Sequence, residues 1–204
     1  MSAQVLSVSL PSEIIYVSGT VNGTAYTWTL IEGAWTATVE RAADDTYAVA
    51  LTAVTAAGVS TNYTLTLYYG LLSLITDRTR ADVVGQTDKG FYNASDLNRV
   101  GAAVEYIAGR FTAIGYACPV TVKKDWLPSD TPTQRQMETY RQNIVTLRGQ
   151  IAVMASTPET PASMAGLNYV KANNIEQILL DLDALIDKLI KSWHFSGELY
   201  AGEV

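Results

Sequence analysis

The chain has 204 residues, 48% of them hydrophobic, which is enough to bury one large core or two small ones. Its formal net charge of −6 argues against nucleic acid as a partner, because phosphate backbones are bound by clustered Lys and Arg. The single cysteine, Cys118, excludes an internal disulfide framework and a multi-cysteine metal site. We expect a soluble globular protein with no cofactor, no metal and no membrane insertion.

Residues 1–70 alternate apolar and polar side chains in twos, which is the period of β-strands. The alternation is clearest over residues 47–54 and 63–69. Earlier strands are expected at residues 5–10, 14–21, 25–31 and 34–40. Asn22-Gly23 and Glu32-Gly33 are hairpin signals, because glycine readily takes the positive φ of tight turns. Six short strands at this spacing predict a small antiparallel β-sandwich.

Residues 44–58 resemble the penultimate strand and following turn of bacterial immunoglobulin-like and fibronectin-type modules. In those modules a tyrosine at this place closes its hydroxyl onto nearby backbone as a tyrosine corner. The resemblance implies that role for Tyr47 and an immunoglobulin-like fold for residues 1–70.

The strand half has five aromatic side chains that allow two interpretations. As a binding surface, they would form a platform on which a carbohydrate stacks: Trp28, Trp35, Tyr16, Tyr26 and Tyr63. In the alternative, which we favour, one or both tryptophans are core anchors, the usual place of tryptophan in a domain this small.

After Gly70 the apolar residues recur at alternating steps of three and four, as on amphipathic helices. Thr79 and Asp82 have the spacing of a capping box for a brief helix. Longer helices are expected over about residues 95–114, from Thr131 to Met154, and over 169–193, with roughly a dozen residues between the last two. In the second, residues 131–134 would be the capping box, with Pro132 at the first helical position.

Three amphipathic helices of similar length predict an up-down-up three-helix bundle. The expected organisation is therefore an α+β chain of two domains: residues 1–70 form the sandwich, and residues 71–204 form the bundle and a short extended tail. The apolar run of residues 71–75 leaves no polar linker between them, so we expect the two domains to pack on each other.

The helical half offers little catalytic chemistry. His194 is the only histidine in the chain, and no nucleophile motif lies near it or near Cys118. Asp181, Asp183 and Asp187 belong to the solvated face of the last helix in the interpretation that their spacing favours. We therefore expect a protein that is not an enzyme.

The C-terminal tail is unusually aromatic and glycine-broken. Its candidate assembly residues are Trp193, Phe195, Leu199 and Tyr200. Either the tail folds back on the bundle, which we favour slightly, or it docks on a neighbouring subunit as an added strand.

Several phrases of the helical half occur together in a recognisable combination. They are residues 74–79 with 81–83, 92–100, 125–126, 132–137, 172–181 and 195–203. In this combination the chain resembles uncharacterised tail- or baseplate-associated proteins of phages and prophages of gut Firmicutes. It departs from that pattern between Val84 and Phe91, where those proteins usually carry a longer helical insertion.

The resemblance implies a non-enzymatic virion structural protein, assembled in the cytoplasm of the bacterial host. Its helical module would bind other virion proteins or further copies of itself, and its β module would contact a surface such as host polysaccharide. The alternative is a carbohydrate-binding surface module that uses the aromatic residues of the strand half.

Overall fold

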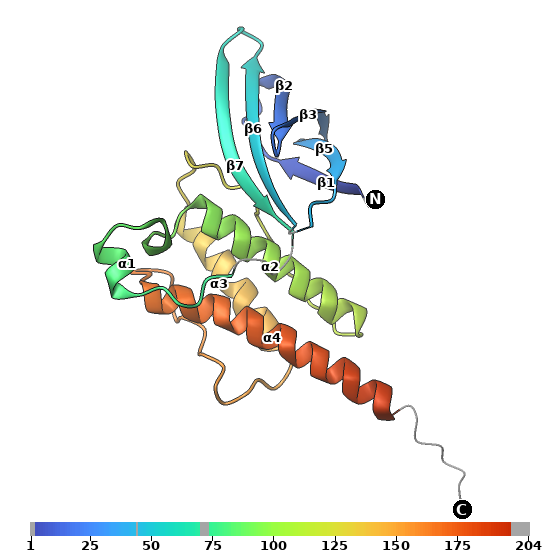
Figure 1. Ribbon diagram of the computed structural model, residues 1–204, viewed down its shortest axis with the longest axis vertical. Helices are drawn as coiled ribbons and strands as arrows, with labels where there is room; N and C mark the ends of the chain where they lie inside the picture. Colours follow the sequence, from blue (N-terminus) through green and yellow to red (C-terminus); the bar gives the residue numbers. More distant parts are fainter. Residues whose placement is uncertain (1–2, 44, 70–73, 197–204) are drawn as a thin grey trace, which may run out of the picture. The chain divides into compact units, whose positions relative to one another are not determined.

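The computed structural model describes residues 3–43, 45–69 and 74–196 of the chain. Over these ranges the protein is α+β: two antiparallel sheets, of three and four strands, precede a region of four α-helices and one 3₁₀ turn (Figure 1). The expected α+β class and its order along the chain are confirmed. Gly70 and residues 71–73, where we placed the domain boundary, lie outside the described residues.

The first sheet holds three strands in the order β1-β5-β4, and the second holds four in the order β3-β2-β6-β7. Their bounds are β1 Ala3–Val8, β2 Ile14–Val21, β3 Thr24–Thr27, β4 Thr29–Ile31, β5 Ala34–Glu40, β6 Thr46–Thr55 and β7 Ser60–Tyr68. The turns at Asn22-Gly23 and Glu32-Gly33 have φ of 49° and 81°, and of 49° and 83°. Two consecutive positive φ values match the expected tight hairpin turns.

The single strand expected over residues 25–31 is instead two strands in different sheets. At Trp28 the chain leaves β3 and enters β4, and the Trp28 side chain is only 5% exposed. Alternation alone cannot show this change, because both strands continue the same period of two.

The helices are α1 Arg80–Val84, α2 Ala94–Ala113, α3 Gln134–Arg148 and α4 Tyr169–Ser196, with the 3₁₀ turn η1 at Asp88–Gly90. The capping box of Thr79 and Asp82 is confirmed at the start of α1. The box expected at Thr131 is wrong: Thr133 caps α3 together with Gln136, so Pro132 precedes the cap. Since α3 ends at Arg148 and not at Met154, the connection to α4 is longer than the dozen residues expected.

The chain divides into two compact units. Of the described residues, the first unit, here called the strand unit, comprises 3–43, 45–69, 92–102 and 123–131, and the second, the helical unit, comprises 74–91, 103–122 and 132–196. Two segments that follow the sheets in sequence therefore belong to the strand unit. The core of that unit includes Leu127, which packs with the inward side chains of both sheets.

Tyr47 has no exposed surface, and its hydroxyl accepts a 3.0 Å hydrogen bond from the Ala42 backbone N–H. This is the closure that the resemblance to immunoglobulin-like modules implies for Tyr47. The bond fixes the chain where it turns from β5 into β6.

Candidate functional site

The five aromatic residues of the expected carbohydrate platform do not lie on one surface. Trp28 and Trp35 are 5% and 7% exposed and belong to the core of the strand unit. Because a ring with both faces covered cannot stack on a sugar, the platform loses its two tryptophans. Tyr26 and Tyr63 are partly buried against the same core, and Tyr16 alone is well exposed, at 58%.

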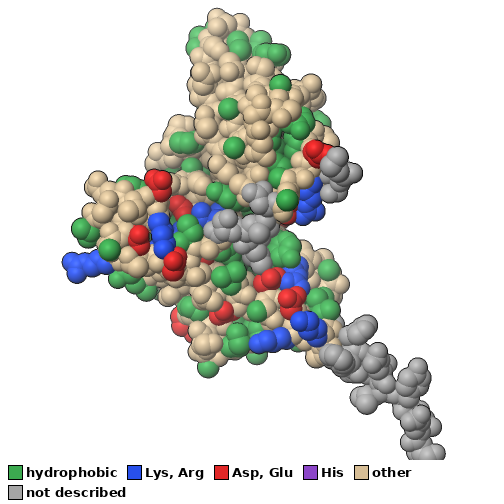
Figure 2. Space-filling model, viewed as in Figure 1, with side chains coloured by type: hydrophobic (Ala, Val, Ile, Leu, Met, Phe, Trp, Pro, Cys, Tyr) green, Lys and Arg blue, Asp and Glu red, His purple; other side chains and the backbone are tan. Residues whose placement is uncertain are grey.

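The outer face of the second sheet is covered by hydroxyl and small side chains. Across the sheet, Ser18 pairs with Thr52, which pairs with Asn62, and the Thr52 hydroxyl bonds to the Asn62 side chain. The sequence has no charged residue in 14–31 or 46–76. The surface over β6 and β7 is accordingly mostly tan and green in Figure 2. Such a face can offer hydrogen bonds but little electrostatic attraction.

Asn98 joins three segments of the strand unit. Its side-chain amide donates to the Trp126 carbonyl at 3.0 Å and accepts from the Trp126 N–H at 2.6 Å. The same amide donates to the Thr66 carbonyl in β7 at 3.3 Å. Asn98 is 1% exposed, so these bonds satisfy a buried polar group. Its chemistry here is structural: it holds residues 123–131 against the sheet.

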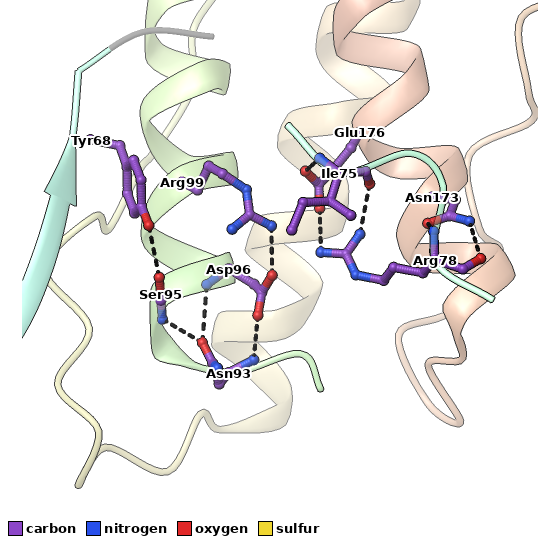
Figure 3. Close-up of polar contacts among 9 residues, drawn as sticks. All are labelled: Tyr68, Ile75, Arg78, Asn93, Ser95, Asp96, Arg99, Asn173 and Glu176. Carbon is purple, nitrogen blue, oxygen red and sulfur yellow. Dashed lines mark hydrogen bonds and ion pairs between the residues drawn. The ribbon is translucent and has the colours of Figure 1, made fainter. Parts of the chain in front are cut away.

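The start of α2 is held by a second polar cluster, drawn in Figure 3. The Asn93 side chain accepts from the backbone of Ser95 and Asp96, and Asp96 accepts in turn from the Asn93 N–H at 2.8 Å. Arg99 pairs with Asp96 at 2.5 Å. The Tyr68 hydroxyl bonds to Ser95 at 2.9 Å and so ties β7 to this helix end.

A third cluster, in the helical unit, ties the segment before α1 to α4 (Figure 3). Arg78 and Glu176 form a 2.8 Å ion pair whose side chains are 1% and 0% exposed. Glu176 also accepts the Ile75 N–H at 2.5 Å. Asn173 binds the Arg78 backbone in both directions, at 3.1 and 2.9 Å. These four residues fasten the segment to the helix.

The acidic residues of α4 are only partly solvated. Asp183 and Asp187, expected on the solvated face, both pair with Arg110 of α2, and their side chains are 24% and 53% exposed. The hydrogen bond from Arg110 lowers the pKa of Asp187. A carboxyl whose pKa is lowered stays ionised at neutral pH, so Asp187 is poorly suited to act as a general acid.

Cys118, the possible metal ligands and the helices were the other features to consider for a functional role. Burial raises the pKa of the Cys118 thiol, which disfavours the reactive thiolate. Among the described residues, no three His, Cys, Asp or Glu side chains gather as a metal site would require. None of the helices in the described ranges combines the length and apolarity needed to cross a bilayer.

The candidate assembly tail falls outside what the structure describes. This holds for Leu199 and Tyr200 and for the side chains of Trp193, His194 and Phe195. Whether the tail folds back or docks on a neighbour stays a prediction.

Sequence reasoning did not single out the buried Arg78–Glu176 pair or the role of Asn98. Spacing alone gives no sign that residues about 100 positions apart will pair. Searches against protein-family models, curated proteins and solved structures found no match to this chain.

Proposed function

We propose that this chain is a non-enzymatic structural protein of a phage or prophage virion, belonging to the tail or baseplate. Its helical unit would serve assembly, and its strand unit would contact a surface such as host polysaccharide. The supporting observation concerns the sequence phrases that resemble phage tail and baseplate proteins: their polar residues form bonds inside the fold. Arg78, Asp96, Asn98, Asp125 and Glu176 are all buried and all bonded within the fold.

The polar residues of these phrases hold segments of the fold together, as we would expect if the phrases characterise a structural protein. Burying a charge is costly unless it is paired and hydrogen-bonded, so such residues define which segments lie together. In this chain they connect the segment before α1 with α4, β7 with α2, and the end of β1 with residues 123–131. A role in assembly needs that kind of fixed framework, with exposed surface left over for partners.

We also propose that the two sheets form an immunoglobulin-like sandwich. The immunoglobulin arrangement pairs its strands, counted from the second strand (B) to the final one (G), in the same two orders, β1-β5-β4 and β3-β2-β6-β7. The Tyr47 hydroxyl bond supports the same assignment. For the helical region, we propose that α2, α3 and α4 make an up-down-up bundle.

The virion assignment is tested in a bacterium that encodes this chain. The prophage is induced, particles are purified on a density gradient, and their proteins are identified by mass spectrometry. We expect peptides of this chain to co-purify with the major capsid protein in a fixed ratio, while an abundant host enzyme stays behind. Peptides found only in the particle-free lysate would show that the chain is no virion component.

A second candidate, a carbohydrate-binding module, is favoured by the uncharged hydroxyl face beside the exposed Tyr16 ring. Its test is binding to purified cell-surface polysaccharide by the wild type and by Tyr16→Ala. Tyr106→Ala is the matched control, because Tyr106 is also exposed, at 43%, but lies on α2. Loss of binding in Tyr16→Ala alone supports this function, and equal binding by both variants removes Tyr16 from it.

A further inference from the structure

The second sheet ends at β7, and the hydrogen bonds around β7 show which of its backbone groups face outward. Tyr69 donates its N–H to the Asp45 carbonyl at 2.9 Å, and Thr55 donates to the Val59 carbonyl at 3.0 Å. Val59 and Tyr69 are odd-numbered residues that flank β7, and each bond joins one of them to a residue that flanks or ends β6. Since backbone groups alternate sides along a strand, the even-numbered residues of β7 point their N–H and C=O away from β6.

The Asn98 contact agrees with this orientation, and among the described residues it reaches only one end of the edge. Asn98 donates to the carbonyl of Thr66, an even-numbered residue. Nearer the start of β7, Ser60, Asn62 and Thr64 are exposed, and no hydrogen bond within the described part of the chain reaches their outward backbone groups. A strip of three N–H and three C=O groups is therefore open.

The β7 edge lacks proline, charged side chains and a bulge, which in other proteins block the pairing of one edge strand with another. The strand has nine residues, with no Pro and no charge, and its register with β6 is continuous. The other edge strands are shorter: β1 has six residues, β3 four and β4 three. An uncharged edge of this length, with outward backbone groups that have no partner among the described residues, has the features that strand addition requires.

We propose that a second copy of this chain pairs with this edge, β7 against β7, antiparallel about a two-fold axis at Asn62. Asn62 then faces Asn62 of the partner subunit, and Ser60 faces Thr64 of the partner subunit. All three are outward-facing positions, so each opposed pair exchanges two backbone hydrogen bonds. A second copy fits because it brings the same open groups, and one event satisfies both edges. The pairing does not depend on the virion assignment.

The dimer is expected to be weak. A strip of five residues buries less than the roughly 1,200 Å² of a stable interface, so its population should rise with concentration. Sedimentation velocity of the full chain from about 10 µM to about 1 mM covers the range where such an interface associates. A wild type that stays monomeric throughout overturns the proposal.

Charge substitution at the axis tests the geometry. Asn62→Lys and Asn62→Glu should each lose the dimer, because like charges then face each other, while an equimolar mixture should recover a heterodimer. Ser18→Lys is the matched control: it places the same charge on the same exposed face, two strands away, and should dimerise like the wild type. A dimer that persists in Asn62→Lys, or a mixture that fails to associate, overturns the proposed pairing. Circular dichroism of each variant confirms that it is folded.

Discussion

Glu176 shows how a single buried charge is stabilised in this fold. Its carboxylate accepts a hydrogen bond from the Ile75 N–H and pairs with Arg78, and its side chain has no exposed surface. The pair need not be more stabilising than an apolar pair of the same size, since desolvation offsets the attraction. Removing one partner is a different matter, because the other charge stays buried.

We expect Glu176→Gln to lower the free energy of unfolding by about 3–5 kcal/mol, the usual cost of leaving a buried charge unpaired. Urea denaturation followed by circular dichroism measures it. Glu138→Gln is the control: it also removes a carboxylate from an arginine pair, but Glu138 is 55% exposed, so the change should be much smaller. Equal effects of the two substitutions would contradict the structural role of the buried pair.

Removing the Tyr47 hydroxyl tests the corner between β5 and β6. Tyr47→Phe keeps the ring in the core but leaves the Ala42 N–H without its acceptor, so we expect a loss of about 1 kcal/mol of stability. Tyr16→Phe, at an exposed position, should leave the urea midpoint unchanged. An unchanged midpoint for Tyr47→Phe would mean that the bond contributes nothing.

At the scale of strands and helices, we expect the same substitution, glycine to alanine, to change stability in opposite directions at two positions. A Cβ at Gly19 in β2 would overlap the Ala50 carbonyl oxygen and lie 2.7 Å from Leu51 Cδ2. Gly19→Ala should therefore destabilise the protein by about 1–3 kcal/mol, the cost of overpacking. In α2, a Cβ at Gly109 meets nothing within 4 Å, so Gly109→Ala should stabilise by about 0.5–1 kcal/mol through helix propensity. Thermal unfolding of both variants checks the two signs.

The capping box of α1 predicts a pH dependence for that helix. Hydrogen bonds from the Thr79 hydroxyl and backbone lower the pKa of Asp82. A carboxyl whose pKa is lower in the folded state stabilises that state above its unfolded pKa and loses the effect as pH falls through the folded pKa. The protection of the α1 amides, measured relative to their intrinsic exchange rate at each pH, should therefore fall below about pH 4, and Asp82→Asn should remove that loss of protection.

For the molecule as a whole, Leu127 shows that the strand unit needs residues far along the chain. Leu127 is 4% exposed and packs in the core formed by both sheets. We expect Leu127→Ala to destabilise the protein by about 2–5 kcal/mol, the range for deleting a buried leucine side chain. Leu30→Ala, at a 52% exposed position, is the control that should change little in the same urea titration.

For the same reason, a fragment of residues 1–69 should not fold like the full chain. It lacks Leu127 and the Asn98 amide that holds residues 123–131, so part of its core is left open. We expect poor dispersion in its proton NMR spectrum. A fragment with the full chain's strand resonances would contradict the contribution of these later residues.

Much of the local structure in this protein, though not every element boundary, follows from the order of its residues. Alternation in twos predicts the strands, and steps of three and four predict the helices, because each pattern reflects the geometry of a single element. The hairpin glycines and the box at Thr79 are local as well, since their partners lie within a few residues.

Which distant residues meet depends instead on how the elements pack. Trp28 is buried because the chain changes sheets there, and Arg78 is paired because α4 brings Glu176 to it. Asn98 and Leu127 join the strand unit by contacts that no spacing encodes. The physical reason is that burial and pairing arise between elements, whereas periodicity records only the face that each residue occupies on its own element.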